Sequence, residues 1–169
     1  MNLTRLVACL SFCFLMLKLA GVSAADTSLL QRASGGDPHS EDNVGYDYER
    51  GLAGYPVDMT QAAKWYRKAA EQGDAWGAWK LGLFYENALG GLPKDTSAAV
   101  RWYQVSAEHG SAAGQTALAN MYYAGRGVAA NLDRALKWWE KSAAQGDASG
   151  ETSLGELYRD GHGVPKDDQ

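Results

Sequence analysis

The chain has 169 residues, of which 46% are hydrophobic and 21% are charged, a composition that excludes disordered and fibrous proteins and suits one compact domain or a short repeat array. Its 16 Lys and Arg residues against 20 Asp and Glu residues give a net charge of −4, so we expect no nucleic-acid partner, because nucleic-acid binding needs a basic surface. Two cysteines are too few for a small domain held together by disulfides.

Residues 1–25 have the pattern of a secretory signal peptide. An apolar stretch at 6–17 follows a positively charged start and precedes a run of small residues. An uncleaved membrane anchor is the alternative, but a spanning helix needs about 20 apolar residues, and Lys18 interrupts this stretch. We therefore expect cleavage near Ala24/Ala25, a secreted or periplasmic protein, and no stable membrane insertion after cleavage.

Cleavage at that site would also change the chemistry of the mature chain. Both cysteines of the sequence, Cys9 and Cys13, lie in the signal segment, as do the basic residues Arg5 and Lys18. The mature chain would then carry 14 basic and 20 acidic residues. Disulfides, thiol catalysis and cysteine-ligated metals are excluded for such a chain.

A repeat of 36 to 37 residues follows the signal segment. The phrase KWYRKAAEQGD at 64–74 returns as RWYQVSAEHGS at 101–111 and as KWWEKSAAQGD at 137–147. A second phrase, represented by LGLFY, alternates with it at 44–48, 81–85, 118–122 and 154–158. The resulting division is an N-terminal half-repeat at 26–37, full repeats at 38–74, 75–111 and 112–147, and an incomplete repeat at 148–169.

Both phrases predict helices, which gives about seven to eight helices in antiparallel pairs. In the LGLFY phrase, Leu81, Gly82 and Tyr85 lie on one side of a helix. The KWYRKAAEQGD phrase spaces its apolar residues at i, i+3, i+4, i+7 and i+8; these residues are Ala62, Trp65, Tyr66, Ala69 and Ala70. No segment alternates with period two, so we expect no sheet.

Residues that begin and end helices recur at the same period. Side chains that can accept an N-terminal N–H bond are Asp58, Asp95 and Asn131 in one set and Asp74, Ser111 and Asp147 in the other. Glycines placed to end helices in a left-handed conformation are Gly73, Gly110 and Gly146, and Gly51, Gly125 and Gly161. Ala88 interrupts the last set, and we expect Gly90 and Gly91 to take over its role.

A further repeated position is occupied by small residues, Gly45, Gly82, Ala119 and Gly155. Glycine costs about 1 kcal/mol of helix propensity relative to alanine, which is tolerable where a neighbouring helix must approach closely. We expect Trp65, Trp102 and Trp138 to fill the space on the other side. A single helix pair cannot bury both of its apolar faces, so the pairs must stack.

These phrases resemble the Sel-one-like repeat family, a relative of the tetratricopeptide repeat. GRGV at 125–128 and DGHGVPKD at 160–167 are similar to the loop of that family. The segment 88–91 departs from the usual G-x-G loop, and the paired cysteines of some members are absent from the predicted repeats. The resemblance implies a right-handed α-solenoid of about 3.5 repeats that serves as a scaffold or adaptor for other proteins and has no defining catalytic site.

The search for chemistry in the sequence points the same way. The three histidines, His39, His109 and His162, show no metal-ligand spacing. The G-x-S-x-G motif is absent, and no glycine-rich loop has the P-loop pattern. The recurring Asp58 and Asp95 are explained as helix caps. We therefore expect a non-enzymatic protein with no catalytic residue, cofactor or metal.

The remaining candidates lie on the first helix of each repeat, off the side that packs. If the solenoid is tetratricopeptide-like, these helices line its concave surface, with positions His39, Asp42, Tyr46 and Glu49; Trp76, Trp79, Leu83 and Glu86; Ala113, Thr116, Asn120 and Tyr123; and Ser149, Thr152, Glu156 and Arg159. The predicted partner-binding residues are Trp76, Trp79, Leu83, Glu86, Tyr46, Glu49, Asn120 and Tyr123.

Two interpretations of Trp76 and Trp79 remain open at this point. They form an aromatic surface with acidic neighbours, which suits a protein or peptide partner with apolar and basic side chains, or one of them packs between adjacent first helices. The alternative to a protein-binding module is a carbohydrate or cell-wall binder that stacks sugars on these rings, or more rarely a hydrolase.

Overall fold

The computed structural model describes residues 24–160. Residues 1–23 of the predicted signal peptide, with both cysteines, and the end of the last predicted repeat with Gly161 lie outside the described residues. In the described part, the chain forms eight α-helices and no strand. The helices are α2 (Ala24–Ser34), α3 (Pro38–Arg50), α4 (Met59–Glu71), α5 (Ala75–Glu86), α6 (Thr96–Glu108), α7 (Ala112–Ala124), α8 (Leu132–Ala143) and α9 (Ala148–Asp160).

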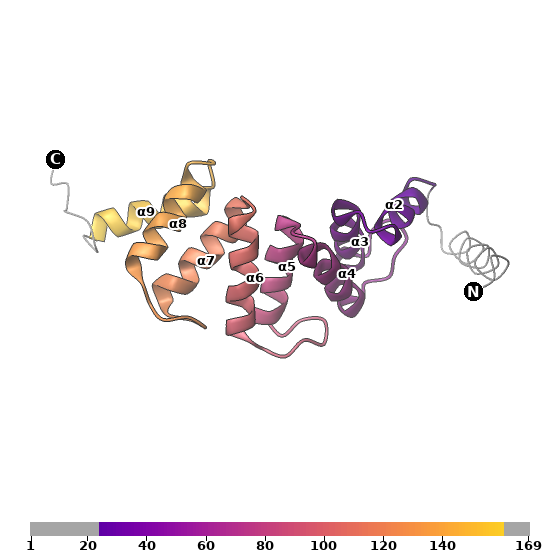
Figure 1. Cartoon of the computed structure of the whole chain (residues 1–169), viewed down its shortest axis with the longest axis horizontal. Helices are drawn as coiled ribbons and strands as arrows, with labels where there is room; N and C mark the ends of the chain where they lie inside the picture. The colour runs from indigo at the N-terminus through magenta and orange to yellow at the C-terminus, as the bar shows by residue number, and fades with distance from the viewer. Residues whose placement is uncertain (1–23, 161–169) are drawn as a thin grey trace.

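The helices follow one another along an elongated array, from α2 at one end to α9 at the other (Figure 1). The most extensive contacts join the first and second helix of each repeat, α3 with α4, α5 with α6, and α7 with α8. Contacts between α4 and α5, α6 and α7, and α8 and α9 join successive repeats. The prediction of an all-α solenoid of stacked helix pairs is confirmed.

The predicted helix caps are also confirmed. The side chains of Asp58, Asp95 and Asn131 accept N–H bonds from the first turns of α4, α6 and α8. Gly73, Gly110 and Gly146 have φ angles of +84°, +91° and +78°, which only glycine adopts without strain.

One turn differs from the expectation. Ala88 itself adopts a left-handed φ of +55°, and Gly90 and Gly91 follow at +60° and +76°. The turn after α5 therefore shares the left-handed conformation among three residues instead of bypassing Ala88.

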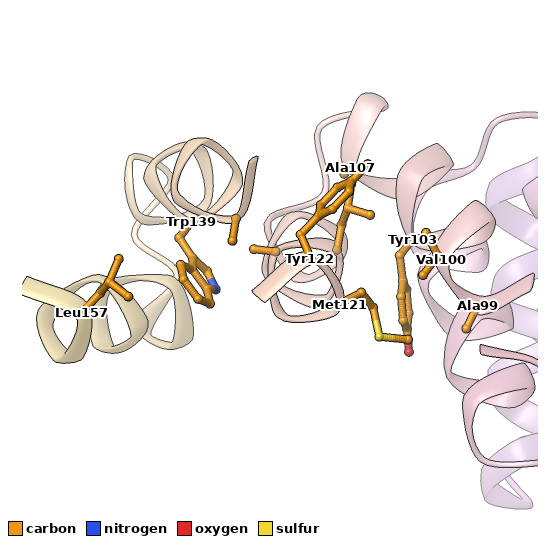
Figure 2. Packing of buried hydrophobic residues seen from close by; sticks show 11 residues of the cluster. Ala99, Val100, Tyr103, Ala107, Met121, Tyr122, Trp139 and Leu157 are labelled. Carbon is orange, nitrogen blue, oxygen red and sulfur yellow. The ribbon is translucent and has the colours of Figure 1, made fainter. Parts of the chain in front are cut away.

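The core contains the aromatic residue that follows each repeated tryptophan. Tyr66, Tyr103 and Trp139 are 0%, 1% and 3% exposed, whereas Trp65, Trp102 and Trp138 are only half-buried. Trp102 and Trp138 pack against the core from its edge. The fully buried position belongs to the next residue, because a shift of one residue turns a side chain about 100° around a helix. Figure 2 shows Tyr103 and Trp139 in the core that extends from α6 to α9.

The repeated glycines explain why these rings fit. A Cβ atom added at Gly45 would lie 2.8 Å from the ring of Tyr66, and one added at Gly82 would lie 2.5 Å from the ring of Tyr103. The predicted close approach at this position is confirmed, and the element that approaches is a tyrosine ring of the second helix. Within residues 24–160, no helix has the length and apolar character needed to cross a membrane.

Candidate functional site

All predicted partner-binding residues lie on the first helices of the repeats, α3, α5 and α7. We call the surface that these helices form with α9 the first-helix face. Tyr123 on α7 is 52% exposed, and the other seven are half-buried: Tyr46, Glu49, Trp76, Trp79, Leu83, Glu86 and Asn120. The candidate surface is thus composed of side chains that both pack and face solvent.

The centre of this surface contains a lysine, Lys80, that is not among the residues predicted from the sequence. The Nζ atom of Lys80 lies 5.0 Å from the ring centre of Trp76 and 5.5 Å from that of Trp79. The rings of Tyr46 and Tyr66 lie 5.7 Å and 5.9 Å from the same atom. These distances are within the range of cation–π attraction. The sequence signal was the position of Lys80, directly after Trp79 on the same helix.

The ammonium group of Lys80 is paired with the carboxylate of Glu49. Its Nζ atom donates to Glu49 Oε1 and Oε2 at 3.0 Å and 2.9 Å, and the two side chains are 10% and 16% exposed. Glu49 Oε2 also accepts a hydrogen bond from the Tyr66 hydroxyl at 2.5 Å. Burial, followed by the hydrogen bond and charge of Glu49, raises the pKa of Tyr66 above its usual range, so the hydroxyl stays a donor.

Trp76 has the packing role that one of the two interpretations of the sequence expected. Trp76 packs edge-on against Tyr46 of α3 and Tyr66 of α4, with ring centres 5.7 Å and 5.6 Å apart. Trp79 lies 6.3 Å from Trp76. Trp76 therefore helps to join the first and second repeats, whereas Trp79 packs against the core cluster that extends from α6 to α9. Both rings keep part of their surface open to solvent.

The second repeat reproduces the acidic part of this arrangement. Glu86 accepts a hydrogen bond from the Tyr103 hydroxyl at 2.6 Å and another from Arg126 Nη1 at 2.7 Å. Burial and the bond to Glu86 raise the pKa of Tyr103 above its usual range. Glu49 and Glu86 are thus each paired with a cation and a phenol, and neither is a free carboxylate.

The third repeat is built differently. Asn120 accepts a hydrogen bond from Trp139 Nε1 at 3.0 Å, because the indole of Trp139 replaces the phenol of the other repeats. Tyr123 occupies the position of Glu49 and Glu86, and its ring lies 5.4 Å from that of Trp139. At this position the first-helix face therefore presents an exposed aromatic ring in place of a carboxylate.

A second cluster lies where α3 begins and meets the start of α5. His39 Nδ1 is 2.8 Å from Asp74 Oδ2, and His39, Asp42 and Asp74 each bring one possible metal-ligand atom within 4.8 Å of the others. Burial and the negative charge of Asp74 raise the pKa of the Asp42 carboxyl to about 7. The sequence predicted no metal ligands, since its histidines show no metal-ligand spacing along the chain and Asp74 is far from His39 in sequence.

Comparison with known proteins identifies the repeats. The family model described as Sel1 repeat matches residues 38–74, 77–111, 112–147 and 148–169. A protective antigen of uropathogenic Escherichia coli with an SLR fold is similar at 38% identity and a TM-score of 0.77 over 84% of this chain. A Sel1 repeat protein from Oxalobacter formigenes is similar at 35% identity and a TM-score of 0.73 over 78% of this chain.

A third solved structure, cysteine-rich protein B of Helicobacter pylori, is similar at 30% identity and a TM-score of 0.53, over 56% of this chain and 70% of its own. The chain spans only 30% of the Escherichia coli antigen and 52% of the Oxalobacter protein. No curated protein sequence matches the chain.

Proteins with these repeats are generally protein-interaction modules and typically non-catalytic scaffolds. The family model covers nearly all of residues 38–169, and the helix pairs, caps and buried rings described above recur at the same period. The chain therefore belongs to the Sel1 repeat family.

Proposed function

We propose that this protein is a non-enzymatic scaffold or adaptor that is exported from the cell and binds a protein or peptide partner on the first-helix face. The observation that carries this proposal is the row of partly exposed aromatic and apolar side chains on neighbouring first helices. The row comprises Trp76, Trp79 and Leu83 on α5 and Tyr123 on α7.

The aromatic end of this row is held in place before any partner arrives. Lys80 is surrounded by rings and paired with Glu49, so Trp76 and Trp79 have little freedom to lose on binding. Because association must offset the entropy of ordering side chains, preorganised tryptophans are good anchors. Tryptophan and tyrosine are also the residues that most often dominate interface energies.

The charge of the chain supports a basic partner, although Glu49 and Glu86 are already paired with Lys80 and Arg126. The attraction would come from the excess of 20 acidic over 14 basic residues in the mature chain. Such long-range attraction raises the association rate and is screened by salt. We expect the partner to bind more slowly at high ionic strength.

Export rests on the signal-peptide pattern of residues 1–25. Intact-mass analysis of the protein from the medium or periplasm of its native host tests it. The mass of a chain that begins at Ala25 or Asp26 supports cleavage, and the mass of the full-length chain in the cell pellet contradicts it.

Site-specific photo-crosslinking tests the binding surface. A photoreactive phenylalanine at Tyr123 should capture a partner from the exported proteins of the host. The same probe at Trp65, a half-buried tryptophan of the second helix α4, is the matched control and should capture none. Equal capture at both positions would place the interaction elsewhere.

The variant Trp79→Ala then tests the energetic role of the aromatic surface. With the captured partner purified, we expect Trp79→Ala to weaken binding about thirtyfold, as for an anchor tryptophan worth about 2 kcal/mol. Trp65→Ala should leave affinity unchanged. A Trp79→Ala protein that stays folded and binds normally would exclude this surface.

A further inference from the structure

The carboxyl of Asp42 is the most unusual polar group on the first-helix face. Asp42 is 8% exposed, and among the described residues its Oδ1 atom is buried without a hydrogen-bond partner. Leaving a charged group buried and unsatisfied is costly. The neighbouring carboxyl of Asp74, 5% exposed, adds a second negative charge to the same place.

The third repeat shows how the same scaffold satisfies this position when no second charge is present. Asp147 is the repeat equivalent of Asp74, and Thr116 is the equivalent of Asp42. Thr116 Oγ1 donates to Asp147 Oδ1 at 2.9 Å. The threonine hydroxyl thus donates to the carboxylate in the third repeat, whereas in the first repeat a second carboxyl, that of Asp42, faces Asp74.

The third member of the cluster is His39, which contacts Asp74 on one side and faces solvent on the other. His39 Nδ1 contacts Asp74 Oδ2, and the histidine side chain is 83% exposed while that of Asp74 is 2% exposed. Asp74 Oδ1 is already used, since it accepts the N–H of Gly77 at 2.6 Å. The cluster therefore offers one imidazole nitrogen and two carboxylate oxygens, with solvent on the histidine side.

We propose that His39, Asp42 and Asp74 bind a divalent transition-metal ion such as zinc, which joins the start of α3 to the start of α5. One nitrogen and two oxygens form a three-ligand set that zinc accepts, with water in the remaining position. The imidazole favours zinc over calcium or magnesium, which prefer all-oxygen sites. The ion takes the place of the proton between His39 and Asp74 and supplies the missing partner of Asp42.

The geometry requires only a small adjustment. The possible ligand atoms lie within 4.8 Å of one another, and zinc binds nitrogen and carboxylate oxygen at about 2.0–2.2 Å. The exposed His39 ring is free to move toward the two buried carboxyls. Asp74 is fixed by its bond to Gly77 and provides the rigid part of the site.

Calorimetric titration of the untagged protein with zinc chloride tests the proposal. We expect one zinc ion per chain and a higher melting temperature with zinc, because an ion that binds only the folded chain stabilises it. Cobalt chloride should give the visible absorption bands of a four- or five-coordinate site. Magnesium and calcium chloride should bind more weakly than zinc. Absence of zinc binding, or binding of calcium or magnesium only, would overturn the proposal.

Three variants assign the site. Asp42→Thr copies the arrangement of the third repeat and should abolish zinc binding while the protein stays helical. His39→Gln should weaken zinc binding by about tenfold or more. The double variant His109→Gln, His162→Gln removes the other histidines of the sequence and should bind zinc normally. Unchanged binding by Asp42→Thr, or loss of binding in the double variant, would show an adventitious ion only.

Discussion

The first and third repeats place a carboxylate at the same position, Asp74 and Asp147, and give it different neighbours: the carboxyl of Asp42 in the first repeat and the hydroxyl of Thr116 in the third. In the third repeat, burial would raise the pKa of Asp147, but hydrogen bonds from the Gly150 N–H and from the Thr116 and Ser142 hydroxyls outweigh it and lower the pKa. The first repeat has no hydroxyl at the position of Ser142, because Ala69 stands there. Asp42 instead faces Asp74, and its pKa is raised.

The same two repeats differ at their buried rings. Tyr66 donates to Glu49 in the first repeat, and Trp139 donates to Asn120 in the third. The helices and caps around the two rings are nevertheless alike. The solenoid thus maintains its apolar packing from repeat to repeat while its buried polar pairs change, and those pairs are where the repeats acquire individual properties.

The largest expected effect comes from the packing that the two repeats share. Tyr66→Ala and Trp139→Ala should each lower the free energy of unfolding by about 3–5 kcal/mol, as large-to-small core substitutions do. Trp65→Ala and Trp138→Ala, at half-buried neighbouring positions, should cost clearly less. Urea denaturation measures all four. A larger loss at Trp65 than at Tyr66 would contradict the assignment of the core.

A smaller effect is expected from the buried ion pair between Glu49 of the first repeat and Lys80 of the second. Lys80→Met leaves Glu49 without its cation and should cost about 2–3 kcal/mol, because removal of one partner of a buried pair exposes the other to an apolar environment. The double variant Lys80→Met, Glu49→Gln should recover part of this loss. Chemical denaturation of both proteins measures the difference, and equal stability of the single and double variants would show that Glu49 without its cation carries no penalty.

Exchanging residues between the repeats tests the comparison directly. At pH 8 with a chelator present, Asp42→Thr should stabilise the protein by about 1–2 kcal/mol, since it removes a buried charge beside Asp74. Thr116→Asp should destabilise it by a similar amount. Thermal and urea unfolding measure both, and the same direction of change for the two substitutions would argue against the comparison.

The pH dependence of this effect has a definite sign. The pKa of Asp42 is raised from 3.8 to about 7, so the folded chain holds this proton more tightly than the unfolded chain. Its contribution to stability is complete below pH 4 and is lost as the pH rises to about 7. His39 and Asp74 face the same group, and Tyr66 lies near it. Unfolding curves with chelator should therefore show the advantage of Asp42→Thr shrink toward pH 4.

The smallest effect is expected at the exposed end of the first-helix face. Tyr123→Ala should change the free energy of unfolding by about 0.5 kcal/mol or less, because surface substitutions rarely cost more. Glu49→Ala, at the equivalent position of the first repeat, should cost more, since Glu49 has two buried partners. Similar losses for the two variants in urea would mean that Tyr123 is structural.

Much of the architecture followed from the sequence by itself. The repeat period, the helix pairs, the caps at Asp58, Asp95 and Asn131, and the close approach at Gly45 and Gly82 were all predictable. These features depend on local spacing and on backbone conformation, which a chain carries in its own order of residues. Repetition strengthened each signal, because the same pattern appeared several times.

The tertiary structure decided which side chains meet. Periodicity placed Trp65 and Tyr66 on the same side of a helix but did not show which one enters the core. The tyrosine does, because the glycine opposite leaves space for its ring and Glu49 accepts its hydroxyl. Likewise, the position of Lys80 among four rings depends on how three helices converge.

The candidate metal cluster also depends partly on the sequence and partly on the tertiary structure. The sequence placed His39 and Asp42 on the first-helix face and Asp74 at the start of a helix, and each had a separate explanation. Only the stacking of α5 beside α3 brings Asp74 against the other two. The order of residues determined the helices and their ends, whereas contacts between residues distant in sequence determined the charge environment, because electrostatic and packing energies depend on distance in space.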